Sequence, residues 1–77
     1  MVEIRNIRYI NGIIYADCYP ERKASLKFSM EIDVSTREVI SISKDEYDAY
    51  VTHAKRCLLR YIDQGKPFPE VTGEVWV

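Results

Sequence analysis

Apolar and polar residues alternate most regularly between residues 26 and 34. Every second side chain there is apolar, and the set is Leu26, Phe28, Met30, Ile32 and Val34. Polar or charged residues fill the positions between them, as in a strand with one buried and one wet face. The pattern predicts a strand over about 25–34. The polar run 35–38 then predicts a turn with its left-handed residue at or beside Arg37, followed by a shorter strand over about 38–42.

Another pair of strands is indicated by the dipeptide Asn11-Gly12, which separates two β-type segments, about 2–10 and 13–19. Asn-Gly readily takes the positive φ angles of a two-residue turn between antiparallel strands. If Ile10 pairs with Ile13, the inward-facing set is Ile7, Tyr9, Ile14, Ala16 and Cys18. The outward-facing set is then Arg8, Ile10, Ile13, Tyr15 and Asp17. Val2 and Ile4 are out of phase with the inward set, which predicts a β-bulge near Arg5 and Asn6.

After Ser43 the spacing of apolar residues changes from two to three and four, which is the helical period. The apolar stripe consists of Tyr47, Tyr50, Val51, Ala54, Cys57, Leu58, Tyr61 and Ile62. Residues 43–46 read S-K-D-E, a capping box, and Gly65 followed by Pro67 ends the helix. We expect a helix over about 44–64 and a final strand over about 70–77. Leu59 lies outside the stripe and is expected to point away from the core.

These elements predict an α+β fold with a single antiparallel sheet of four to five strands, in the order ββββαβ. The helix has one apolar stripe and the strands share one apolar face, so the long helix is expected to pack on one face of the sheet. A chain of 77 residues suits a single domain, and we assign residues 1–77 to it.

The charge balance gives no reason to expect a polyanionic partner, because 11 basic and 12 acidic residues leave a formal net charge of -1. Glu3, Arg5 and Arg8 interrupt the region where a secretion signal would need an apolar run, and no stretch approaches the roughly 18 apolar residues of a membrane span. We therefore expect a cytoplasmic protein without membrane contact. Cys18 and Cys57 are then expected to be reduced, buried thiols rather than a disulfide.

His53 and Cys57 lie four residues apart in the expected helix and raise the question of a reactive or metal-binding pair. A nucleophilic thiol needs solvent access and a lowered pKa, but Cys57 falls inside the apolar stripe while His53 stands at its border. Zinc needs three or four ligands, and only Cys18 offers itself as a third. We predict no catalytic residue, no cofactor and no metal, and a thiol enzyme using Cys57 and His53 is the least favoured function.

One helix can cover only one face of the sheet, so the opposite face needs another explanation. We expect Ile10, Ile13, Tyr15 and Trp76 on this uncovered face, and apolar side chains there are typical of association surfaces. The predicted function is protein association through this uncovered face or through an open edge of the sheet, with a second copy of the chain or with another protein. The alternative is nucleic-acid binding through Arg8, Tyr15 and Lys27, although the acidic Asp17, Glu31 and Asp33 share their face.

Residues 54–70, AKRCLLRYIDQGKPFPE, combine a helical segment with the sequence Gly-Lys-Pro-x-Pro-Glu. This stretch, about a quarter of the chain, resembles the end of HicB-type antitoxin domains. The resemblance implies a small α+β partner protein that binds and neutralises a toxin, and so an antitoxin-like regulatory domain. The two preceding hairpins depart from that family, because its usual strand with a Pro-Gly-Cys-like turn is missing from them.

Overall fold

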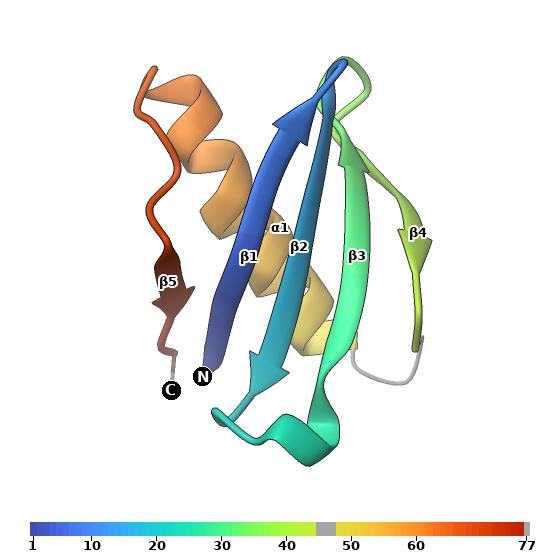
Figure 1. The fold of residues 1–77 in the computed structure, drawn as a ribbon, viewed down its shortest axis with the longest axis vertical. Coiled ribbons are helices and arrows are strands. Elements are labelled where there is room, and N and C mark those ends of the chain that lie inside the picture. Colours follow the sequence, from blue (N-terminus) through green and yellow to red (C-terminus); the bar gives the residue numbers. More distant parts are fainter. Residues whose placement is uncertain (45–47, 77) are drawn as a thin grey trace.

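The computed structural model describes residues 1–44 and 48–76, which form one antiparallel five-stranded sheet and one α-helix (Figure 1). The elements are β1 (Val2–Ile10), β2 (Ile13–Pro20), the 3-10 helix η1 (Ala24–Leu26), β3 (Phe28–Asp33), β4 (Glu38–Ile42), α1 (Asp48–Asp63) and β5 (Val71–Glu74). The predicted α+β class and the order ββββαβ are confirmed. In space the strands follow the order β4-β3-β2-β1-β5. The acidic half of the predicted capping box and Tyr47 lie outside the described residues.

The first hairpin forms as the Asn-Gly signal predicts. Asn11 and Gly12 have φ angles of 51° and 80°, and Ile10 pairs with Ile13. The register of β1 against β2 shifts between Arg5 and Arg8, where Asn6 takes a φ of 54°. This shift is the predicted β-bulge, and it brings Val2 and Ile4 onto the same buried face as the inward residues of β2.

The third strand begins later than predicted, at Phe28 instead of about residue 25. Residues Ala24–Leu26 form η1, in which the amide of Leu26 donates to the carbonyl of Lys23 over 3.0 Å. The backbone groups in these hydrogen bonds are not available for pairing with a neighbouring strand. The strand therefore begins only at Phe28, although the apolar and polar residues already alternate from Leu26. The turn between β3 and β4 is as expected, with Arg37 at a φ of 62°.

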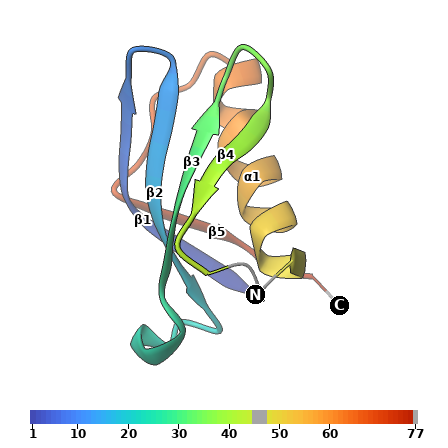
Figure 2. The same ribbon diagram turned by 90° about the vertical axis from the view of Figure 1, so that its right-hand side faces the viewer.

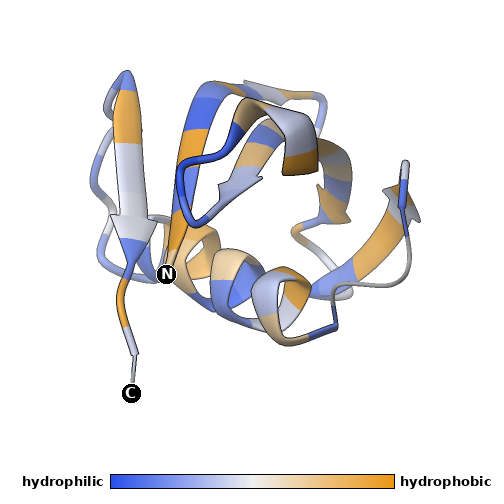
Figure 3. Cartoon of the chain, turned by 90° about the horizontal axis from the view of Figure 1, so that it is seen from below, coloured by the Kyte–Doolittle hydropathy of each residue, from blue (hydrophilic) through white to orange (hydrophobic). Residues whose placement is uncertain are grey.

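The core lies between α1 and the inner face of the sheet, which curves around the helix (Figure 3). Its buried residues are Val2, Ile4, Ile14, Ala16, Cys18, Phe28, Met30, Ile32, Ala54, Cys57, Leu58 and Leu59. Leu59 is only 4% exposed, so the expectation that it points away from the core is wrong. Because the sheet curves, the β3–β4 turn reaches the outer flank of α1, where Arg37 bonds to Asp63 beside Leu59.

The last strand is shorter than predicted, and the side chains that alternate with its valines turn toward the helix. Val71 and Val75 are exposed, whereas Thr72 and Glu74 point toward the helix and Trp76 packs against the core. The expectation of Trp76 on the uncovered sheet face is therefore wrong. The reason is that β5 lies at the edge of the sheet beside α1, where polar groups of the helix can bind Thr72 and Glu74.

In the described part of the chain, no helix combines the length and apolar character that crossing a bilayer requires.

Candidate functional site

The face of the sheet opposite α1 carries the residues that the sequence singled out for association. We call it the outer face and define it by the outward residues of β1, β2 and β3: Arg8, Ile10, Ile13, Tyr15, Asp17, Glu31 and Asp33. Figure 2 shows α1 on the other side of these strands. No second helix among the described residues covers this face.

One cross-strand row of the outer face joins opposite charges through an aromatic ring. Arg8 on β1 pairs with Tyr15 on β2, and Tyr15 pairs with Glu31 on β3. The guanidinium of Arg8 lies over the Tyr15 ring, 5.4 Å from its centroid, in a cation–π arrangement. Within the described residues, neither Arg8 nor Glu31 has an ion-pair partner. Arg8 Nε donates a hydrogen bond to the carbonyl oxygen of Asn6 over 3.2 Å, so the row presents a cation and a carboxylate without ion-pair partners among the described residues, one on each side of Tyr15.

The next row toward the hairpin places Ile10 and Ile13 beside Asp33 and Glu38. Ile10 is 51% exposed and Ile13 is half-buried. The carboxylate of Asp33 accepts hydrogen bonds from the backbone amide and the hydroxyl of Ser35, and these bonds lower the pKa of Asp33. Ile10, Ile13 and Tyr15 thus share the outer face as predicted, while Trp76 does not.

The residues proposed for nucleic-acid contact also share this face, but one of them is engaged. Lys27 lies 3.7 Å from Asp17, which further accepts hydrogen bonds from Asn6 and Ser29. Burial raises the pKa of Asp17, but the hydrogen bonds and nearby cations outweigh that effect and leave the pKa lowered. A phosphate at Lys27 would compete with this ionised carboxylate, so the arrangement favours charge pairing within the sheet.

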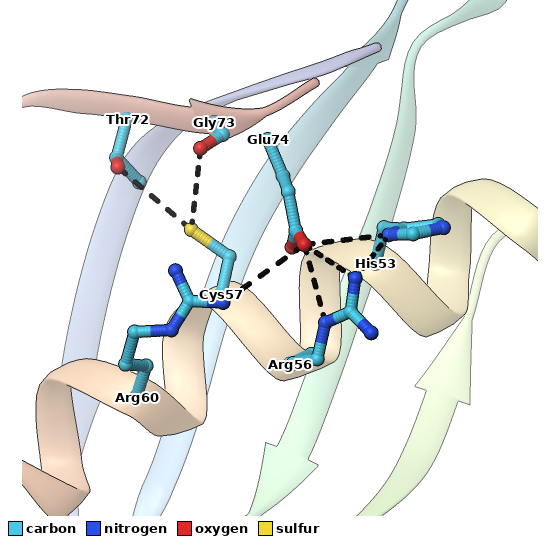
Figure 4. A network of polar contacts seen from close by, with 7 residues as sticks. All are labelled: His53, Arg56, Cys57, Arg60, Thr72, Gly73 and Glu74. Carbon is cyan, nitrogen blue, oxygen red and sulfur yellow. Dashed lines mark hydrogen bonds and ion pairs between the residues drawn. The ribbon is translucent and has the colours of Figure 1, made fainter. Parts of the chain in front are cut away.

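Trp76 instead contacts His53, which is part of a polar cluster between α1 and β5 that the sequence did not reveal. Figure 4 shows the cluster without Trp76. Glu74 is at its centre, and its Oε1 lies 2.5 Å from Arg56 Nη2 and 3.4 Å from His53 Nδ1. The His53 ring stacks on Trp76. Glu74 Oε2 is buried and has no hydrogen-bond partner within the described residues. The signal for this cluster in the sequence is that Thr72, Glu74 and Trp76 occupy alternate positions and so share one face of the strand. The valines on the other face made that other face look like the buried one.

Cys57 is close to this cluster, but its polar contacts are with β5. The side chain is 2% exposed, and Sγ lies 3.6 Å from the carbonyl oxygen of Gly73 and 3.8 Å from Thr72 Oγ1 (Figure 4). Burial raises the pKa of Cys57, and it raises the pKa of Cys18 to about 12. A raised pKa keeps the thiol protonated at neutral pH, which is the opposite of nucleophile activation.

No three His, Cys, Asp or Glu side chains within residues 1–44 and 48–76 are grouped so that they could hold a metal ion. Comparison of the chain with protein-family models, with curated proteins and with solved structures found no match.

Proposed function

We propose that the protein is a non-enzymatic association module that forms a homodimer through the outer face of its sheet. The observation that carries the proposal is the row Arg8, Tyr15 and Glu31, which holds charges of opposite sign on either side of one tyrosine, neither of them in an ion pair within the described part of the chain. A two-fold interface requires a surface that is complementary to itself, and such a row meets that requirement.

The charge pattern selects one orientation of the two copies. In a face-to-face pair with its two-fold axis running close to the direction of β2, β1 of one copy lies over β3 of the other. Arg8 of each copy then faces Glu31 of its partner, and the two Tyr15 rings meet near the axis. An axis across the strands would instead place β1 over β1 and bring like charges together. Packed sheets commonly align their strands within about 30°, and both arrangements meet this condition, so the charges alone select the first one.

Apolar contact would come from the hairpin end of the face. Ile10 and Ile13 lie one row from Tyr15, and burying the half-exposed Ile10 side chain supplies hydrophobic free energy that the charges alone do not.

The buried, free Cys18 and Cys57 support a reducing compartment, and the proposed location of the protein is the cytoplasm.

Charge-swap variants test the homodimer directly. We expect light scattering of the wild-type chain to show a dimer that dissociates on dilution. Arg8→Glu should prevent self-association, because it sets two carboxylates against each other across the interface, and Glu31→Arg should do the same by setting two cations together. An equimolar mixture of the two variants should form a heterodimer, since a contact between the two substituted side chains again joins opposite charges.

Matched controls change the same charges elsewhere. Lys23→Glu and Glu70→Arg are exposed loop substitutions and should leave the dimer intact. A wild-type chain that stays monomeric at every concentration contradicts the proposal. If the monomer instead binds single-stranded RNA with an affinity that falls with salt, the function is the alternative one through Arg8, Tyr15 and Lys27. Tight binding of the monomer to a protein toxin would support the antitoxin-like alternative.

A further inference from the structure

A basic hollow lies on the outer flank of α1, away from the outer face of the sheet. Its volume is about 400 Å³, and its lining residues are Arg37, Lys55, Arg56, Leu59, Arg60 and Asp63. This volume is near the lower end of the range of small-molecule sites, about 300–1,000 Å³. The helix supplies most of the lining, and Arg37 reaches in from the β3–β4 turn. The buried Leu59 lies among the charged side chains.

Two of the four cations in the hollow are already neutralised. Arg37 donates two hydrogen bonds, of 2.8 and 2.9 Å, to the carboxylate of Asp63, and they lower the pKa of that carboxyl. Arg56 binds Glu74 at 2.5 Å through Nη2 and at 3.1 Å through Nε. These contacts fix both guanidinium groups and use the two carboxylates at the site.

The other two cations have no acidic hydrogen-bond partner among the described residues. Lys55 forms no ion pair within the described residues, and Arg60 Nη2 lies 3.9 Å from Glu74 Oε1, beyond hydrogen-bond distance (Figure 4). Four cations against the carboxylates of Asp63 and Glu74 leave a net charge of +2 in and around the hollow. This excess is local, because the chain as a whole carries a formal net charge of -1.

We infer that this hollow binds a small phosphate-bearing ligand, with Lys55 and Arg60 as its charge partners. Guanidinium and ammonium groups bind phosphate oxygens through charge-assisted hydrogen bonds, and the fork of donors on Arg60 suits two oxygens at once. A group with two negative charges would balance the local excess. The volume leaves room for a diphosphate, and the ion pair between Arg37 and Asp63 holds one wall in place.

Inorganic pyrophosphate is a suitable probe. The full chain, labelled with ¹⁵N, is titrated with it at constant ionic strength, and the amide resonances of Lys55, Leu59 and Arg60 should move along a saturable curve. Lys55→Glu and Arg60→Glu should each weaken the affinity by about tenfold or more, as expected for the loss of a charge-assisted hydrogen bond. Lys23→Glu makes the same charge change in the loop between β2 and β3, at the opposite end of the sheet from Arg37, and should bind normally (Figure 1).

Two results would overturn the inference. One is the absence of any saturable shift. The other is an equal loss of affinity in Lys23→Glu, which would show that the ligand responds to the overall charge of the protein and not to this hollow. Circular dichroism checks that each variant is folded. The hollow is separate from the outer face, so Lys55→Glu and Arg60→Glu should keep the wild-type assembly state. Light scattering of these variants thus separates a failure of phosphate binding from a failure of dimerisation.

Discussion

The indole ring of Trp76 lies flat against the imidazole ring of His53, with the ring centroids 3.8 Å apart and the planes inclined by 4°. Tyr50 meets the same indole edge-on, at 5.5 Å between centroids. These contacts attach the segment after β5 to the first half of α1, because both ring partners of Trp76 belong to the helix. Side chains thus join the sheet edge to the helix.

Replacing Trp76 with alanine should therefore destabilise the fold. The substitution removes a half-buried indole and two ring contacts, and we expect the free energy of unfolding to fall by roughly 1–3 kcal/mol. Urea denaturation followed by far-ultraviolet circular dichroism measures it. Val75→Ala is the matched control, since Val75 is 76% exposed and should cost less than about 0.5 kcal/mol. Equal losses in the two variants would contradict the packing role of Trp76.

Gly73→Ala should weaken the pairing of β5 with β1. A Cβ atom at Gly73 would collide with the backbone carbonyl oxygen of Val2, and backbone cannot move aside as a flexible side chain can. We expect a loss of about 2 kcal/mol, typical of overpacking, together with faster hydrogen exchange of the β1 amides. Gly65→Ala serves as comparison: its φ of 65° strains alanine, but nothing lies within 4 Å, so about 1 kcal/mol is expected. A smaller effect at Gly73 than at Gly65 would show that β5 can shift freely.

The elements that the sequence predicted well are those specified by neighbouring residues. Alternation defines β3, the Asn11-Gly12 turn defines the first hairpin and its register, and three- and four-residue spacing defines α1. Each signal lies within one continuous segment of the chain. The face of the sheet that holds Ile10, Ile13 and Tyr15 followed from that register.

The errors concern positions whose surroundings come from distant parts of the chain. The sequence pattern suggests that the apolar Val71 and Val75 form the buried face of β5. The structure instead turns Thr72 and Glu74 toward the helix, because they form hydrogen bonds there with Tyr61 and Arg56 of α1. The buried Leu59 similarly lines the same hollow as Arg37 from the β3–β4 turn, a neighbour that the helical spacing alone does not reveal. The row that joins Arg8, Tyr15 and Glu31 needs the register of β2 against β3, and the loop between those strands leaves it unspecified in the sequence.

Neither cysteine should react readily in the native protein. Burial raises the pKa of both thiols, that of Cys18 to about 12, and Cys57 is 2% exposed. Labelling with iodoacetamide at neutral pH should therefore be much slower than in urea and should follow the opening of the fold. Mass spectrometry of the digested protein reports each site. Fast labelling of native Cys57 would contradict this prediction and favour the thiol-enzyme alternative with His53.

The raised pKa of Cys18 also predicts a loss of stability in alkali. Below the ordinary thiol pKa of 9.0 both the folded and unfolded states keep the proton, so the full stability is present. As the pH rises from 9.0 toward about 12, the unfolded state releases its proton first and the free energy of unfolding falls. Cys18→Ala should flatten this alkaline limb in urea titrations at several pH values. An unchanged slope would indicate that other groups cause the loss.

Glu74 should make a corresponding contribution in acid. Burial raises its pKa, but the hydrogen bonds from Arg56 and His53 outweigh burial, and the net pKa lies below the ordinary value of 4.5. A carboxyl with a lowered pKa stabilises the fold above its unfolded-state pKa, and that stability is lost as the pH falls from about 4.5 through the folded-state pKa.

Glu74→Gln should lower the free energy of unfolding by about 1 kcal/mol at pH 7, since it removes the ionic bond to Arg56. The variant should also show a shallower acid limb than the wild type, whereas Glu70→Gln, at an exposed position, should reproduce the wild-type curve. If Glu74→Gln and the wild type lose stability in parallel below pH 4.5, the contacts among Glu74, Arg56 and His53 contribute nothing to the acid sensitivity of the fold.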